Sequence, residues 1–158
     1  MTAILAVPVG GRILVGSDRA ITDLEKHSIG TLAPKVLRVG QWLIGAAGVY
    51  GSDWDALAKI DPPDSPSEWA AHLPCNKDAC VVLVRGKTIR LGEVYDRHWC
   101  WGVTRGACAI GSGGSEVHAA WLALRKYETD PMARMRAALR ASAAVNVTVR
   151  GPFDLIWS

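Results

Sequence analysis

The chain opens with two short, mostly apolar runs, residues 3–9 and 12–15, separated by Gly10-Gly11. Runs of this length that are rich in valine, isoleucine and leucine predict β-strands. Two consecutive glycines readily adopt the positive φ angles of a two-residue turn. The first eighteen residues therefore predict a β-hairpin.

A second hairpin is expected at residues 35–39 and 42–46, with Gly40-Gln41 as its tight connection. The stretch of residues 21–33, which contains His27, lies between the two hairpins. It is interpreted as a linker, with bends at Gly30 and Pro34.

Two short helices are predicted next. Ser52 can cap a helix that places Trp54, Leu57 and Ala58 on one face. That helix must end before Asp61-Pro62, because proline keeps the residue before it out of helical angles. Ser65-Pro66-Ser67-Glu68 then predicts a second start, with a capping-box pattern and proline at the first helical position.

The second half begins and ends with strands around two longer helices. The predicted strands are residues 79–84, 88–94, 99–103, 107–110, 144–149 and 153–157. The first helix would be capped by Ser112 or Ser115 and carries Val117, Ala120, Trp121 and Leu124 at helical spacing. The second begins at Asp130-Pro131, with Met135, Ala138, Leu139 and Ser142 on one stripe.

This order of elements is expected of an α+β protein in which two central sheets lie between outer helices. General rules of layer packing also allow other α+β arrangements. No linker or change of composition divides the chain, and 158 residues suit one domain, 1–158.

Composition and charge indicate which kinds of binding partner are not expected for this chain. The formal net charge is +3 with lysines and arginines scattered along the chain, so nucleic-acid binding is not expected. The start lacks the pattern of a signal peptide, and no stretch approaches the ~18 apolar residues of a membrane span. A soluble, cytoplasmic protein with no membrane partner is expected.

The four cysteines, at positions 75, 80, 100 and 108, match no metal-ligand spacing well. The histidines offer no paired site that would complete a zinc set. The cysteines are interpreted as reduced, mostly buried thiols, with metal or disulfide roles as the alternative. No cofactor or metal is expected.

The first hairpin also brings a hydroxyl and a carboxylate to one end. Antiparallel strands place the start of one beside the end of the next, so Thr2 and Asp18 should be neighbours. A threonine that becomes the first residue after methionine removal has its own α-amine within reach of its hydroxyl. The pKa of an α-amine, about 8, suits a general base at neutral pH. The alternative is that Thr2 is simply the second residue of an ordinary protein.

Five short motifs follow one another in an informative order. They are Met-Thr at the start, Gly-Ser-Asp at 16–18, Lys-Val-Leu-Arg at 35–38, Ala-Gly at 47–48 and Ile-Gly-Ser-Gly-Gly at 110–114. With them the chain resembles the β subunits of proteasome-like peptidases, above all HslV, which are N-terminal-nucleophile (Ntn) threonine hydrolases. The resemblance spans the whole chain. It implies a four-layer αββα sandwich, with the first two helices shortened between residues 49 and 78.

The resemblance also implies roles for three residues at the start of the chain. Thr2 would be the nucleophile once Met1 is removed, and would form an acyl-enzyme with a peptide carbonyl. Lys35 would place a cation beside the Thr2 hydroxyl. Asp18 would keep that lysine charged and fixed, and an ordinary surface ion pair is the alternative.

Further residues take supporting roles by the same resemblance. Gly48 matches the glycine whose backbone N–H is the oxyanion donor, and it also suits a strand-to-helix turn. Ser112 matches the serine that relays protons near the terminal amine, with a helix N-cap as the alternative. Ala20, Ala46 and Tyr50 would line the pocket for the substrate side chain.

Two features depart from the family. Asn146 stands where the family usually has an aspartate that supports the terminal amine, and an amide brings no charge there. With Met1 attached, the free amine would also lie one residue too far from the Thr2 hydroxyl.

Two functions are therefore considered. The first is a threonine peptidase that assembles into rings, acts on polypeptides and is fed by an ATP-driven unfoldase. The second is a catalytically silent scaffold subunit of a larger assembly, such as a viral one. The shortened helices favour the second, and the retained Asp18 and Lys35 favour the first.

Overall fold

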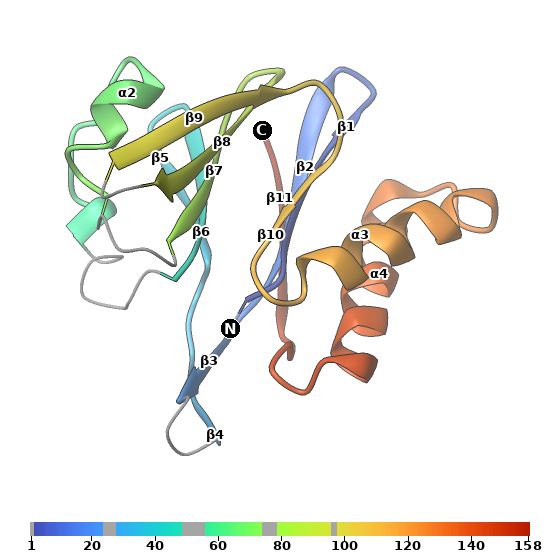
Figure 1. The fold of residues 1–158 in the computed structure, drawn as a ribbon. Coiled ribbons are helices and arrows are strands. Elements are labelled where there is room, and N and C mark those ends of the chain that lie inside the picture. Colours follow the sequence, from blue (N-terminus) through green and yellow to red (C-terminus); the bar gives the residue numbers. More distant parts are fainter. Residues whose placement is uncertain (1, 24–27, 49–55, 74–78, 96–97) are drawn as a thin grey trace.

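The computed structural model describes residues 2–23, 28–48, 56–73, 79–95 and 98–158. The described residues form two large antiparallel β-sheets that pack face to face, with helices on the outside, and a small two-stranded sheet (Figure 1). The α+β four-layer sandwich expected from the sequence is confirmed.

The first sheet has four strands in the order β10-β1-β2-β11. They are β1 (Ile4–Val9), β2 (Arg12–Asp18), β10 (Cys108–Ile110) and β11 (Phe153–Trp157). Gly10 and Gly11 connect β1 to β2 with φ angles of 56° and 84°. The predicted first hairpin is therefore present, and it contributes the two central strands of this sheet.

The second sheet has five strands in the order β5-β6-β7-β8-β9. They are β5 (Val36–Val39), β6 (Trp42–Ala47), β7 (Cys80–Arg85), β8 (Thr88–Tyr95) and β9 (His98–Thr104). The linker predicted over residues 21–33 is wrong, because β3 (Ala20–Asp23) and β4 (Ser28–Leu32) pair there as a separate two-stranded sheet. Gly30, which was interpreted as a bend, lies within β4, and the pairing of the two strands contains a register shift between Ile21 and Thr22.

β1 contributes side chains to both faces of its sheet. Ile4 and Ala6 join the core between the two sheets, whereas Leu5 and Val7 face the helices. This is the two-residue period of a strand that is buried on both sides. All four residues are at most 1% exposed, so the strand that begins beside Thr2 lies at the centre of the domain.

Two helices cover the outer face of the four-stranded sheet: α3 (Gly114–Ala123), continued by the 3₁₀ turn η1 (Leu124–Lys126), and α4 (Pro131–Val145). The Asp130 side chain caps α4 by accepting hydrogen bonds from Met132 N and Ala133 N. The stripe predicted for α4 is confirmed, since its buried residues are Met135, Ala138, Leu139 and Ser142.

Two predictions about the ends of these helices are wrong. Gly113 is the N-cap of α3 and neither Ser112 nor Ser115 occupies that position, because close packing around Gly113 fixes the turn there. The strand predicted over residues 144–149 does not form, because α4 continues to Val145 and a turn follows it.

The outer face of the five-stranded sheet has much less helical cover. α2 (Pro66–Trp69) has four residues, and its Trp69 is buried against Trp42 and Leu83. Proline starts α2 as predicted, but the Ser65 side chain makes no capping bond. Of the predicted preceding helix, Leu57 is buried in this cluster, while Ser52 and Trp54 lie outside the described residues.

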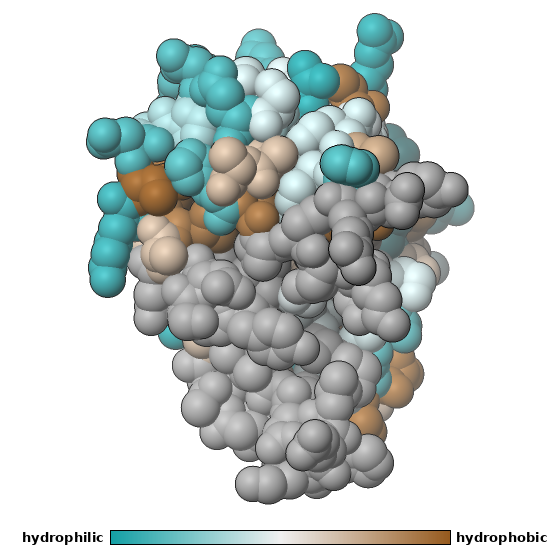
Figure 2. Space-filling view, turned by 60° about the vertical axis from the view of Figure 1, so that its left-hand side comes forward, coloured by the Kyte–Doolittle hydropathy of each residue, from teal (hydrophilic) through white to brown (hydrophobic). Residues whose placement is uncertain are grey.

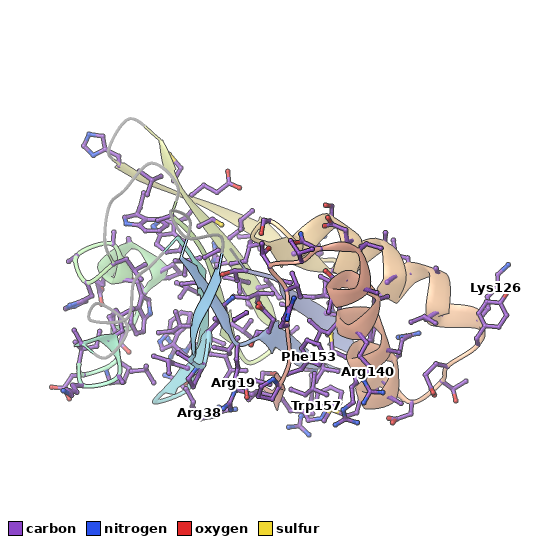
Figure 3. All side chains as sticks on the ribbon, turned by 90° about the horizontal axis from the view of Figure 1, so that it is seen from below. Arg19, Arg38, Lys126, Arg140, Phe153 and Trp157 are labelled. Carbon is purple, nitrogen blue, oxygen red and sulfur yellow. The ribbon has the colours of Figure 1, made fainter. Side chains whose placement is uncertain are left out.

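β11 is an edge strand, and cationic side chains lie along it (Figure 3). Arg19 forms an ion pair with Asp154, and Arg38 donates to the carbonyl of Trp157. On the face seen in Figure 2, the described residues of the upper rim are mostly hydrophilic, with hydrophobic residues between and below them. Among the described residues, no helix combines the length and apolar character needed to cross a membrane.

Candidate active site

The Asp18 carboxylate, at the end of β2, organises the start of the chain. The Asp18 backbone N–H donates to the Ala3 carbonyl at 3.1 Å, and Ala3 N donates back to Asp18 Oδ1 at 2.8 Å. Ala20 N donates to Asp18 Oδ2 at 3.1 Å. The hairpin register pairs Ile4 with Ser17, so Asp18 lies opposite Ala3, one residue from Thr2. The expected proximity of Thr2 and Asp18 is realised through Ala3.

The Lys35 ammonium also donates hydrogen bonds to the Asp18 carboxylate. Its Nζ donates to Asp18 Oδ1 at 3.0 Å and to Oδ2 at 2.9 Å. Lys35 is 7% exposed and Asp18 is fully buried, so the pair is no surface ion pair. Burial lowers the pKa of the Lys35 ammonium more than the attraction of Asp18 raises it. Because Lys35 directly precedes β5, this ion pair links the two sheets.

Thr2 is 6% exposed and is held by its main chain. Thr2 N donates to Ser112 Oγ at 3.4 Å, and Gly113 N donates to the Thr2 carbonyl at 3.0 Å. The start of β1 therefore lies against the turn between β10 and α3 (Figure 1). Gly111 in this turn has a φ of 86°, and a Cβ there would lie 2.2 Å from the Thr2 carbonyl oxygen. Only glycine fits at that position.

The end of α4 supports the same turn. Asn146 Nδ2 donates to the Ser112 carbonyl at 3.2 Å, and Ser142 Oγ donates to the Gly113 carbonyl at 3.2 Å. Asn146 Oδ1 accepts from Thr148 N at 3.2 Å and from Thr148 Oγ1 at 2.6 Å. Ser142 was not identified as a site residue from the sequence. Its only signal there is a hydroxyl within an otherwise apolar helical stripe.

Of the remaining predicted site residues, the structure describes Ala20, Ala46 and Gly48. Ala46 N donates to the Lys35 carbonyl at 3.2 Å, and its buried side chain packs in the outer cluster of the five-stranded sheet. Gly48 follows β6 with a φ of 75°, as a glycine at a turn can. Ala20 is fully buried next to Asp18. Tyr50 lies outside the described residues.

Two cysteines are poor candidates for a nucleophile. Burial is the main cause that raises the pKa of the Cys80 and Cys108 thiols, and a thiol in this state is a poor nucleophile at neutral pH. Within the described ranges, no three His, Cys, Asp or Glu side chains group as a metal site. The residues gathered at the start of β1 supply a hydroxyl, a buried cation, a carboxylate and a second hydroxyl. This set suits acyl transfer at Thr2.

Neither a scan against protein-family models nor a search of curated proteins finds a match. Solved structures do match along nearly the whole chain. HslV from Trypanosoma brucei has a TM-score of 0.75 at 22% identity and covers 98% of both chains. BPH from Thiobacillus denitrificans, solved in complex with epoxomicin, has a TM-score of 0.73 at 17% identity over 99% of this chain and 97% of that one. The chain has the HslV-like, proteasome-type Ntn-hydrolase fold.

A third solved structure matches with a lower TM-score. Anbu from Hyphomicrobium sp. strain MC1 has a TM-score of 0.64 at 12% identity, over all of this chain and 82% of that chain.

Proposed function

We propose that this chain is a threonine-type peptidase subunit, which hydrolyses peptide bonds with Thr2 as the N-terminal nucleophile after Met1 is removed. One observation carries the proposal. The Thr2 nitrogen lies 3.4 Å from Ser112 Oγ, while the next residue, Ala3, is bonded to the carboxylate that binds the buried Lys35 ammonium. A buried ion pair is costly to build and contributes little to stability by itself, so its place beside Thr2 supports a chemical role.

In this reaction the Thr2 hydroxyl attacks the carbonyl carbon of the peptide bond. Its proton passes to the Thr2 α-amine, directly or through the Ser112 hydroxyl, and then to the departing amine of the substrate. A peptide C–N bond breaks and an ester to Thr2 Oγ1 forms. Water, deprotonated by the same amine, then hydrolyses the ester. The Lys35 cation would favour the alkoxide, and the Gly48 N–H would stabilise the oxyanion.

The assembly belongs to the same proposal. A cytoplasmic homo-oligomeric ring would enclose the sites and restrict them to unfolded polypeptides supplied by an ATP-driven unfoldase. The HslV-like fold supports self-association and a polypeptide substrate. Ala20, Ala46 and Tyr50 are proposed to line the pocket that receives the substrate side chain.

A catalytically silent scaffold subunit is the second candidate. It is favoured by the length of α2, which has four residues where helical cover of the outer sheet is expected. The neutral Asn146 in place of the family's aspartate also favours it. Retained Met1 and the absence of a reaction at Thr2 would favour the scaffold.

The first experiment is an intact-mass measurement of the purified chain, followed by incubation with epoxomicin. We expect the mass of a chain without Met1, and one adduct that peptide mapping assigns to Thr2. Thr2→Ala should abolish the adduct and any peptide hydrolysis, whereas Thr2→Ser keeps a hydroxyl and should retain both. Retained Met1 together with equal labelling of wild type and Thr2→Ala would refute the peptidase and favour the scaffold.

A further inference from the structure

The turn formed by residues 111–113 lies between Thr2 and the end of α4. It makes hydrogen bonds to both of them. Toward Thr2, Ser112 Oγ accepts from the Thr2 nitrogen and Gly113 N donates to the Thr2 carbonyl. Toward α4, the carbonyls of Ser112 and Gly113 accept from Asn146 and Ser142. The main chain of Thr2 thus depends on a turn whose own position depends on α4.

Ser142 and Asn146 can donate to the successive carbonyls of Gly113 and Ser112 because of their spacing along the chain. Ser142 and Asn146 are four residues apart, and the Asn146 N–H donates to the Ser142 carbonyl at 2.8 Å. Side chains four residues apart lie on the same side of a helix, about 5–6 Å from each other. The last turn of α4 therefore presents both donors together.

The chemistry of Thr148 fixes the orientation of the Asn146 amide. A backbone N–H can only donate, so the Asn146 atom facing Thr148 N must be the oxygen. The amide nitrogen then faces the Ser112 carbonyl. An ionised aspartate could accept from Thr148 but could donate nothing to Ser112. It would also face the carboxylate of Glu116, whose pKa is lowered by its own backbone N–H, by Ser115 and, to a smaller degree, by Asn146.

Little free space surrounds Gly113 in this turn. A Cβ on Gly113 would lie 2.5 Å from Val149, 3.0 Å from Ala3 and 3.0 Å from Ser142 Oγ. Ser142 is fully buried, so no water can replace its hydroxyl without rearrangement. A shift of α4 at Ser142 should therefore displace Gly113, whose N–H donates to the Thr2 carbonyl.

We propose that Ser142 and Asn146 are positioning residues, which set the main chain of Thr2 through the 111–113 turn, and that position 146 requires a hydrogen-bond donor. The functional consequence of this inference rests on the proposed peptidase. Asn146 then differs from an aspartate that supports the terminal amine, because it acts on the Ser112 carbonyl.

The test compares Ser142→Ala and Asn146→Asp with Ala138→Gly, a control one helical turn earlier on the same buried face of α4. Hydrogen exchange of the Gly113 amide is measured by NMR on each purified chain. We expect exchange roughly tenfold faster or more in the first two variants, at stabilities matched with denaturant, because the carbonyls that fix the turn lose their donors. Ala138→Gly should leave Gly113 exchange unchanged at the same stability.

The second measurement is the rate of epoxomicin labelling, split into the maximal rate and the concentration for half-maximal rate. Misplacing a nucleophile by about 1 Å can cost roughly a hundredfold in rate. We expect Ser142→Ala and Asn146→Asp to lower the maximal rate about 10- to 100-fold with little change in half-saturation. Ala138→Gly should stay close to wild type.

Two results would overturn the inference. The first is Asn146→Asp labelling as fast as wild type or faster, which would restore the role of an amine-supporting carboxylate. The second is Gly113 exchange that Ser142→Ala and Ala138→Gly change equally. If wild type itself is not labelled, the proposed peptidase fails, and the exchange measurement alone decides whether Ser142 and Asn146 hold the turn.

Discussion

The two halves of the sandwich are covered very differently. Over the four-stranded sheet, α4 is a 15-residue helix with a bonded N-cap, and its Met135 and Leu139 pack closely against the strands. A Cβ on Gly16 of β2 would lie 2.6 Å from the Met135 side chain. Over the five-stranded sheet, α2 has four residues and no side-chain cap. Isolated helices shorter than about 12 residues are marginal in water, so α2 depends on the burial of Trp69.

This difference in helical cover indicates which half of the sandwich positions most of the candidate site. Thr2, Asp18, Ser112 and Asn146 all belong to the half that α3 and α4 cover. The other half supplies Lys35 at the start of its edge strand. Packing errors in the first half should therefore disturb the main chain of Thr2, whereas errors in the second half, away from Lys35, Ala46 and Gly48, should mainly cost stability.

The largest loss of stability is expected from a substitution of Lys35, where the two halves join. Lys35→Met leaves the fully buried Asp18 carboxylate without its cation, which should lower the free energy of unfolding by about 3–5 kcal/mol. Denaturant unfolding measures this loss. Asp18→Asn/Lys35→Met should recover part of it, because no charge stays buried. Recovery is incomplete, since an amide cannot accept from both Ala3 N and Ala20 N.

The pH dependence of stability checks the same pair. Because the pKa of Lys35 is lowered in the fold, the unfolded chain binds more protons between that pKa and the ordinary value of 10.5. The Lys35 contribution to stability should therefore rise as the pH rises through this window, and Lys35→Met should lose that rise. Lys87→Met, at an exposed position, should keep it. A cost below about 1 kcal/mol for Lys35→Met would mean that the pair behaves as a surface ion pair.

A pair of leucines compares the two halves directly. Leu139 on α4 and Leu83 on β7 are both fully buried, and each change to alanine should cost about 2–5 kcal/mol. Under the proposed function, only Leu139→Ala should slow epoxomicin labelling of Thr2 when both variants are measured fully folded. Equal slowing by Leu83→Ala would show that the second half also positions the site.

The smallest loss of stability is expected from substitutions at the N-caps of α4 and α2. Asp130→Ala removes two hydrogen bonds from the first turn of α4 and should cost about 1 kcal/mol, measured by thermal or denaturant unfolding. Ser65→Ala at the start of α2 should cost close to nothing, because Ser65 makes no capping bond. A larger loss at Ser65 than at Asp130 would reverse the difference drawn between the two helical layers.

Local patterns predicted those elements whose packing follows local rules. Gly10-Gly11 identified the first hairpin, and the helical period identified the stripe of α4. The strands β3 and β4 were missed because Gly30 was interpreted as a bend, whereas it lies within β4. The valines at 145, 147 and 149 suggested a strand, but α4 continues through the alanines before them and ends at Val145.

The candidate site was predictable in part for a similar reason. Hairpin geometry places Thr2 near Asp18, and the Asp18–Lys35 pair follows from the family resemblance. Ser142 could not be found this way, since its bond to the Gly113 carbonyl joins residues 29 positions apart. A buried hydroxyl in a helical stripe has the same sequence pattern whether or not it has such a partner.

Chain ends are normally the first part of a domain to fray. Here residue 2 is 6% exposed, and hydrogen bonds hold both its nitrogen and its carbonyl. An affinity tag fused ahead of Thr2 would be attached to the nitrogen that donates to Ser112 Oγ, and would remove the free α-amine that the proposed reaction needs. Recombinant work on this domain should therefore carry its tag elsewhere, or use a leader that a processing protease removes cleanly before Thr2.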